Sequence, residues 1–214
     1  MNSSPATYGK TAVLLHWAVA LLIGIALPLG FYMHDLPLSP TKLRYYSYHK
    51  WIGITVLMLA SVRLAWRLTH RAPQMPVTMS RWERRAAAAA HGVLYLLLFV
   101  VPVSGWVMSS AKGFQTVWLG ILPLPDLVEK NKELGNLLSQ VHTGLNLTLA
   151  TLVAGHLLAA LRHQFVSHDA VLSHMVPFLR KPTLAQASAL QESGQSLRKA
   201  AVRFGSQAVD PHNS

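Results

Sequence analysis

The sequence predicts an all-α integral membrane protein, a four-helix bundle with its N-terminus and its C-terminus in the cytoplasm. Of its 214 residues, 51% are hydrophobic and only 13% are charged, whereas soluble domains usually carry about 25% charged residues. Four apolar stretches each approach the roughly 20 residues that a helix needs to cross a bilayer. Basic residues are concentrated in the connections on one side of these stretches, which predicts the orientation.

The predicted spans are apolar stretches separated by polar connections. Their approximate bounds are 12–33, 49–66, 87–108 and 141–160. Pro28 and Pro102 lie toward the far ends of the first and third spans, where a kink is tolerated. The first stretch is too long for a signal peptide, and no small-residue cleavage site follows it. We therefore expect one four-span membrane domain over residues 1–180 and a polar cytoplasmic tail over 181–214.

The orientation follows from the positions of lysine and arginine. Thirteen of these nineteen residues lie before the first span, between the end of the second span and the third, or after the fourth, and six lie on the other side. Cytoplasmic connections carry the excess of basic residues. The connection 109–140 should then lie outside, in the periplasm if the membrane is the inner membrane of a Gram-negative bacterium.

Charge and cysteine content exclude several classes of function. The net charge of +11 does not predict nucleic-acid binding, because the basic residues flank apolar stretches and form no stripe of their own. The chain has no cysteine. This excludes disulfides, thiolate metal sites, iron–sulfur clusters and covalent attachment of c-type haem.

Several histidines lie in or at the edges of the spans, where ionisable residues are costly and usually face the bundle interior. A functional role is the default interpretation, and a hydrogen bond to a neighbouring helix is the alternative for any one of them. The five are His16, His49, His91, His142 and His156.

The spacing of His142 and His156 in the fourth span is the most specific signal. They are 14 residues apart, which at 3.6 residues per turn places them about 40° from the same helix face and about 21 Å apart along the axis. This separation is too large for one metal ion, whose ligands converge within a few ångströms. It suits two large cofactors, one near each membrane surface.

Topology suggests a second ligand for each site. His49 begins the second span on the outer side, level with His142, whereas His16 and His91 both lie on the inner side, level with His156. Topology does not decide between these two. A haem iron held by two imidazoles is an electron-transfer centre without an open position. Glycines near these histidines would admit a flat macrocycle or serve ordinary helix packing; they are Gly53, Gly144 and Gly155.

These features resemble the bacterial cytochrome b561 family, whose four-helix core is shared with the cytochrome b subunits of nickel–iron hydrogenases and formate dehydrogenases. The resemblance covers about residues 8–180, and in the segment 168–175 His174 replaces an arginine of the family. The residues that carry it are His16-Trp17, His49-Lys50-Trp51-Ile52-Gly53, His91-Gly92-Val93-Leu94-Tyr95, Val101-Pro102-Val103-Ser104-Gly105, and the pair His142 and His156. The resemblance implies two b haems whose ligands are His16 with His156 and His49 with His142. It also implies that His91 does not bind iron.

The resemblance further implies ubiquinone as a redox partner. Some family members are similar to superoxide:ubiquinone oxidoreductases, and others exchange electrons with a dehydrogenase or hydrogenase. His91 and Tyr95 would contact the quinone or make structural hydrogen bonds. Arg63 and Arg67 would contact haem propionates, lipid phosphates or simply the membrane interface. Outer cations would attract a small anion or be solvated interface residues; they are Lys42, Arg44, Lys50 and Lys112.

Three classes of function follow. The first is a di-haem carrier that exchanges electrons with ubiquinone in the inner membrane, with superoxide as a candidate periplasmic donor; only then would the chain be an enzyme. The second is a cytochrome b subunit that works docked to a soluble dehydrogenase or hydrogenase. The third is a haem-free ion transporter that uses histidines, which the absence of Asp and Glu within the four spans disfavours.

Overall fold

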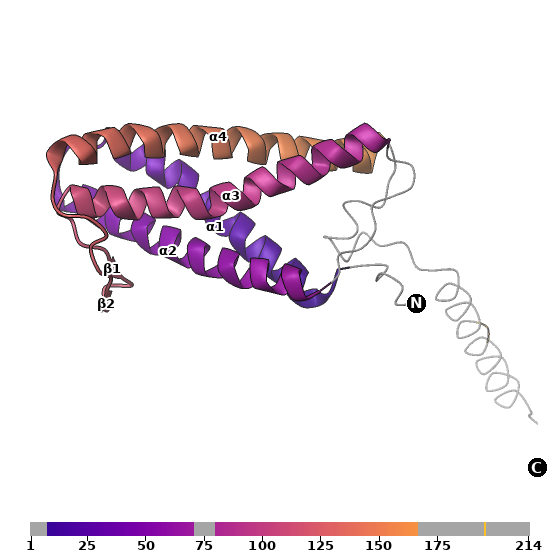
Figure 1. Ribbon diagram of the computed structural model, residues 1–214, viewed down its shortest axis with the longest axis horizontal. Coiled ribbons are helices and arrows are strands. Elements are labelled where there is room, and N and C mark those ends of the chain that lie inside the picture. Colours follow the sequence, from indigo (N-terminus) through magenta and orange to yellow (C-terminus); the bar gives the residue numbers. More distant parts are fainter. Residues whose placement is uncertain (1–7, 71–79, 167–194, 196–214) are drawn as a thin grey trace, which may run out of the picture. The chain divides into compact units, whose positions relative to one another are not determined.

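The computed structural model describes residues 8–70 and 80–166 together with Gln195. Its helices belong to one compact unit, residues 1–176. Figure 1 shows the long helices and a small hairpin of the described residues. The elements are α1 (Lys10–Asp35), α2 (Pro40–Thr69), α3 (Arg81–Ala111), β1 (Val117–Trp118), β2 (Leu122–Pro123) and α4 (Lys132–Phe165). The predicted tail 181–214 lies outside the described residues apart from Gln195, as do His168 and His174.

The predicted all-α membrane fold is confirmed, because each helix contains one predicted span and is long and apolar enough to cross a membrane. The helices extend beyond the spans at their polar ends. Ser39 caps α2 by accepting a hydrogen bond from the Lys42 amide at 3.2 Å, and Asn131 caps α4 in the same way through Leu134 at 3.0 Å. Side-chain caps satisfy amides that have no partner inside the helix and so stabilise a helix start. Because both caps lie in polar segments, these helices begin well before their apolar part.

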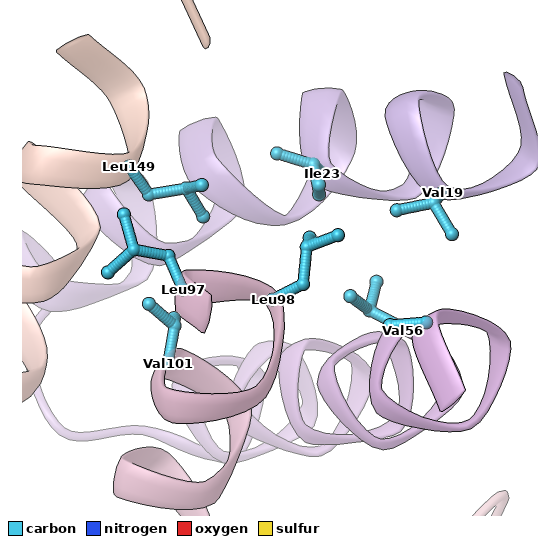
Figure 2. Packing of buried hydrophobic residues seen from close by; sticks show 8 residues of the cluster. Val19, Ile23, Val56, Leu97, Leu98, Val101 and Leu149 are labelled. Atoms are coloured by element: carbon cyan, nitrogen blue, oxygen red, sulfur yellow. The ribbon is translucent and has the colours of Figure 1, made fainter. Parts of the chain in front are cut away.

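The helices pack in chain order: α1 against α2, α2 against α3, and α3 against α4. Among the described helices, α4 makes no extensive backbone contact with α1 or α2. One apolar cluster joins all four helices, and Figure 2 shows its side chains directed toward one another. Its buried members are Val19, Ile23, Val56, Ala60, Leu97, Leu98, Val101 and Leu149. Because Leu149 lies midway between His142 and His156 in the sequence, this cluster forms an apolar layer between the two histidine sites.

The connection between α3 and α4 carries the hairpin of β1 and β2, which pair antiparallel beside α2 (Figure 1). The Trp51 indole donates a hydrogen bond to the Val117 carbonyl at 2.7 Å, and the Trp118 indole donates to the Thr55 hydroxyl at 3.2 Å. Lys50 adds bonds to the carbonyls of Phe114 and Gln115. The hairpin is therefore fixed to the same stretch of α2 that carries His49.

Candidate functional site

One histidine site contains His49 of α2 and His142 of α4. We call it the outer site, and the other the inner site, after the predicted orientation. Their ring centres lie 6.3 Å apart and their planes are at 88°. The two other helices contribute glycines: a Cβ atom on Gly30 of α1 would lie 3.0 Å from His49 Cε1, and one on Gly105 of α3 would lie 2.9 Å from His142 Cε1. All four helices therefore enclose this pair, two through imidazoles and two through backbone that approaches the imidazoles closely.

The two outer imidazoles differ in their hydrogen bonds. The Nδ1 atom of His142 lies 2.9 Å from the hydroxyl oxygen of Ser104 on α3. The Nδ1 atom of His49 is buried and makes no hydrogen bond of normal geometry within the described part of the chain, although the Ala26 carbonyl lies near it. The fold thus supports His142 from α3 through a polar contact and His49 mainly through packing.

The inner site contains His16 of α1 and His156 of α4, whose ring centres also lie 6.3 Å apart, with planes at 70°. His91 of α3 is the third histidine, and its ring centre lies 5.2 Å from that of His156. Its Nδ1 atom donates a hydrogen bond to the Ala87 carbonyl one turn earlier, at 2.6 Å. The structure therefore brings all three inner histidines together, with His16 and His156 at the same separation as the outer pair.

Arg63 of α2 makes hydrogen bonds to both α3 and α1 near the inner site. Its Nε atom donates to the Tyr95 hydroxyl at 3.0 Å, and its Nη1 atom donates to the Ala12 carbonyl at 3.2 Å. The guanidinium of Arg67 lies 5.8 Å from the centre of the Tyr95 ring, within the range of a cation–π interaction. The predicted quinone site (His91 and Tyr95) and the predicted propionate contacts (Arg63 and Arg67) therefore lie together beside the inner histidines. We call these four residues the inner cluster.

In the separation of their ring centres, both histidine pairs fit a haem iron between them. An imidazole nitrogen binds a transition metal at about 2 Å, and the ring centre of a five-membered ring with bonds near 1.33 Å lies about 1.1 Å behind that nitrogen. Two such ligands on one iron place their ring centres about 6.2 Å apart by these values. Both pairs are at 6.3 Å. His91 and His156, at 5.2 Å, are too close for this arrangement.

The glycines near the histidines fall into two groups. A Cβ atom on Gly53, Gly144 or Gly155 would meet no other residue within 4 Å in the described part of the chain. These three glycines therefore do not serve tight helix packing, which was one of the two predicted interpretations. Of the glycines that do touch histidines, Gly30 was not named from the sequence, and Gly105 was named only as part of the motif 101–105.

Two of the predicted outer cations are engaged in contacts within the chain. Lys42 donates hydrogen bonds to the carbonyls of His34 and Leu36. Lys50 donates to the Ser109 hydroxyl at 3.1 Å as well as to the loop carbonyls. These two ammonium groups hold the outer connections in place, and this gives them a structural role independent of any anion.

Sequence comparisons agree with the resemblance drawn from the motifs. Residues 7–178 match the sequence profile of the family described as prokaryotic cytochrome b561. A relative from Escherichia coli (strain K12), named cytochrome b561 homolog 2, is 29% identical over 183 residues, covering 82% of this chain and 94% of the relative. A Yersinia pestis relative, named probable superoxide oxidase CybB, is 27% identical over 180 residues, covering 79% of this chain and 96% of the relative.

Proposed function

Because the chain belongs to the prokaryotic cytochrome b561 family, we propose that it binds two b haems and carries single electrons across the bacterial inner membrane, to or from ubiquinone. Family membership makes the chain a multi-pass membrane cytochrome and disfavours the haem-free transporter. The observation that carries the proposal is the pair of cross-helix histidine contacts, both at 6.3 Å, at two levels of one helix.

In this proposal, His49 and His142 hold the outer haem and His16 and His156 hold the inner one. Bound haem b supplies a one-electron iron couple. The histidines fix the two sites on α4 about 21 Å apart along the helix axis. The apolar cluster around Leu149 lies between the two sites. With two imidazoles holding each haem, the group would supply electron transfer and not ligand chemistry at the metal.

The inner cluster supports a quinone contact. Since His91 Nδ1 donates to the Ala87 carbonyl, the network assigns its proton to Nδ1 and leaves Nε2 able to accept a hydrogen bond. The Tyr95 hydroxyl accepts from Arg63 and keeps its own proton for donation. His91 and Tyr95 thus offer an acceptor and a donor, the groups needed to bind a quinone and to move protons to its oxygens.

Superoxide is the candidate donor at the outer face, in line with the name of the Yersinia pestis relative. Two superoxide anions would each lose one electron and become dioxygen. The two electrons, with two protons taken up at the quinone, would convert one ubiquinone to ubiquinol. A soluble dehydrogenase or hydrogenase subunit docked to the membrane domain would supply electrons instead if the chain is a cytochrome b subunit.

The test uses purified protein in liposomes that contain ubiquinone. An enzymatic source of superoxide is added, and absorbance of reduced b haem and formation of ubiquinol are followed. We expect both signals, and both should vanish when superoxide dismutase is present from the start. His91→Phe should keep the haem signal and lower ubiquinol formation, whereas His34→Phe, at an exposed histidine outside the clusters, should change neither.

Different failures have different meanings. Haem that superoxide does not reduce but ubiquinol does would reject superoxide as the donor and retain the quinone partner. Copurification with a soluble subunit in stoichiometric amount would then favour the docked cytochrome b subunit. Haem that exchanges electrons with neither ubiquinone nor ubiquinol would overturn the proposed quinone reaction.

A further inference from the structure

The hydroxyl of Ser104 connects α3 to the predicted outer ligand on α4. Its oxygen lies 2.7 Å from the Val101 carbonyl and 2.9 Å from His142 Nδ1. A carbonyl oxygen can only accept, and a serine hydroxyl has one proton. The hydroxyl therefore donates to Val101, and its oxygen accepts from Nδ1–H of His142.

This network selects one form of the His142 ring. With the proton on Nδ1, a neutral imidazole carries its free lone pair on Nε2. The lone pair is what a metal ligand needs, and metal-binding histidines almost always donate their other N–H to an acceptor in this way. The bond between α3 and α4 therefore prepares Nε2 of His142 as a ligand.

The next residue on α3 limits where the ring can lie. A Cβ atom on Gly105 would lie 2.9 Å from His142 Cε1 and 3.4 Å from each ring nitrogen. Real side chains essentially never reach the first of these distances, so any larger residue at position 105 would displace the ring. Ser104 holds the ring at Nδ1 and Gly105 borders it at Cε1, and the two neighbours together fix its rotation.

We propose that Ser104 is a positioning residue for His142: it fixes the imidazole tautomer, raises the basicity of the ligand, and lowers the midpoint potential of the outer haem. The inference rests on the proposed function. A more basic ligand stabilises the ferric form, and hydrogen bonds in the surroundings of a haem are a lever on its potential. Within the described residues, no side chain hydrogen-bonds Nδ1 of His49, the other outer ligand, and only the Ala26 carbonyl lies near that atom. Ser104 therefore provides the side-chain hydrogen bond of the outer pair.

The test compares Ser104→Val with Ser104→Thr in the full-length protein. The two variants share one shape, and only threonine keeps a hydroxyl. We expect the valine variant to bind haem at the outer site about 10- to 100-fold more weakly, the usual effect of losing such a partner, and to show a raised potential of the outer haem. The threonine variant should resemble the wild type in both measurements. The inner haem should keep its potential in both variants.

Two further variants separate the bond from general damage. Ser61→Ala removes a hydroxyl that donates to a carbonyl one turn earlier on α2 and should leave both potentials unchanged. Gly105→Ala should alter the low-spin electron paramagnetic resonance signal of the outer haem. Gly24→Ala, where a Cβ atom would meet no described residue within 4 Å, should leave that signal unchanged.

The outcomes distinguish this inference from the proposed function. A wild-type protein that binds no haem would overturn the proposed function and this inference with it. A wild-type protein with two haems, combined with a valine variant that matches the threonine variant in outer-haem potential and affinity, would overturn only the role of Ser104. Equal loss of haem in the valine and threonine variants would also overturn it, since the hydroxyl would then make no difference.

Discussion

His142 shows how much of a ligand's environment comes from other helices. The residue belongs to α4, but its Nδ1 atom faces Ser104 and its Cε1 atom faces Gly105, both on α3. His49 on α2 similarly lies against Gly30 of α1. Each outer imidazole is therefore held between its own helix and a neighbour that approaches closely because it lacks a Cβ atom. The ring has little freedom to rotate at such distances.

Substitution of single histidines tests the predicted ligand pairs. We expect His49→Ala or His142→Ala to remove the outer haem and His16→Ala or His156→Ala to remove the inner one, because each iron would lose one of two axial ligands. His91→Ala should keep both haems. The measurement is the ratio of haem to protein after purification, with redox titration to identify which haem remains. Loss of a haem from His91→Ala, together with its retention in His16→Ala, would contradict the assignment.

Gly53 tests whether a macrocycle lies beside α2. This residue follows His49 by about one helical turn, and a side chain there would meet no described residue within 4 Å. Gly53→Leu should therefore fold normally but lose the outer haem, since leucine would occupy the space the macrocycle needs. Haem content and thermal unfolding of the purified variant provide the measurement. A Gly53→Leu protein with full haem content would place the macrocycle elsewhere.

At the scale of elements, α2 is the helix with the most varied contacts. It carries His49, holds the hairpin through Trp51 and Lys50, and reaches the inner cluster through Arg63. Its N-terminal part extends from Pro40, well before the predicted start at residue 49. Because of its length, α2 contacts the connection between α3 and α4, the apolar layer and the inner cluster.

The bond between Trp118 and Thr55 tests the attachment of the hairpin to α2. Trp118→Phe removes the indole donor and keeps an aromatic ring, and a hydrogen bond of this kind usually contributes about 1 kcal/mol. We expect a modest fall in thermal stability. Thr55→Val should cause a similar fall, and the double variant should be little worse than either single one. Fully additive losses would show that the two side chains do not act as a pair.

The helices were predictable from the sequence because apolar stretches of membrane length leave few alternatives. Their ends were not, since caps such as Ser39 and Asn131 lie in polar segments that hydropathy ignores. The pairing of His49 with His142 was predicted from depth and helix face. At the inner site depth did not decide between His16 and His91, and only the family resemblance indicated His16, because the separation of the rings depends on packing. Ser104 and Gly105 stood in a quoted motif, but their contacts with His142 depend on how α3 rotates against α4.

At the scale of the whole molecule, the proposed orientation places both termini and the inner cluster in or near the cytoplasm. The native chain has no cysteine, so a single introduced cysteine reports its own side of the membrane. Glu129→Cys and Thr11→Cys both replace exposed residues. In intact spheroplasts, we expect a membrane-impermeant thiol reagent to label the first and spare the second. The reverse pattern would invert the orientation and move the proposed quinone cluster to the periplasmic side.

The central claim is that one chain holds two b haems, one beside His142 and one beside His156 of α4. A pyridine haemochrome assay with reduced-minus-oxidised spectra on the purified wild-type protein tests it most directly. We predict two b haems per chain with low-spin spectra, because both histidine pairs have the separation that two axial imidazoles require. Protein isolated from cells with ample haem that carries no haem, or only one per chain, would contradict the claim.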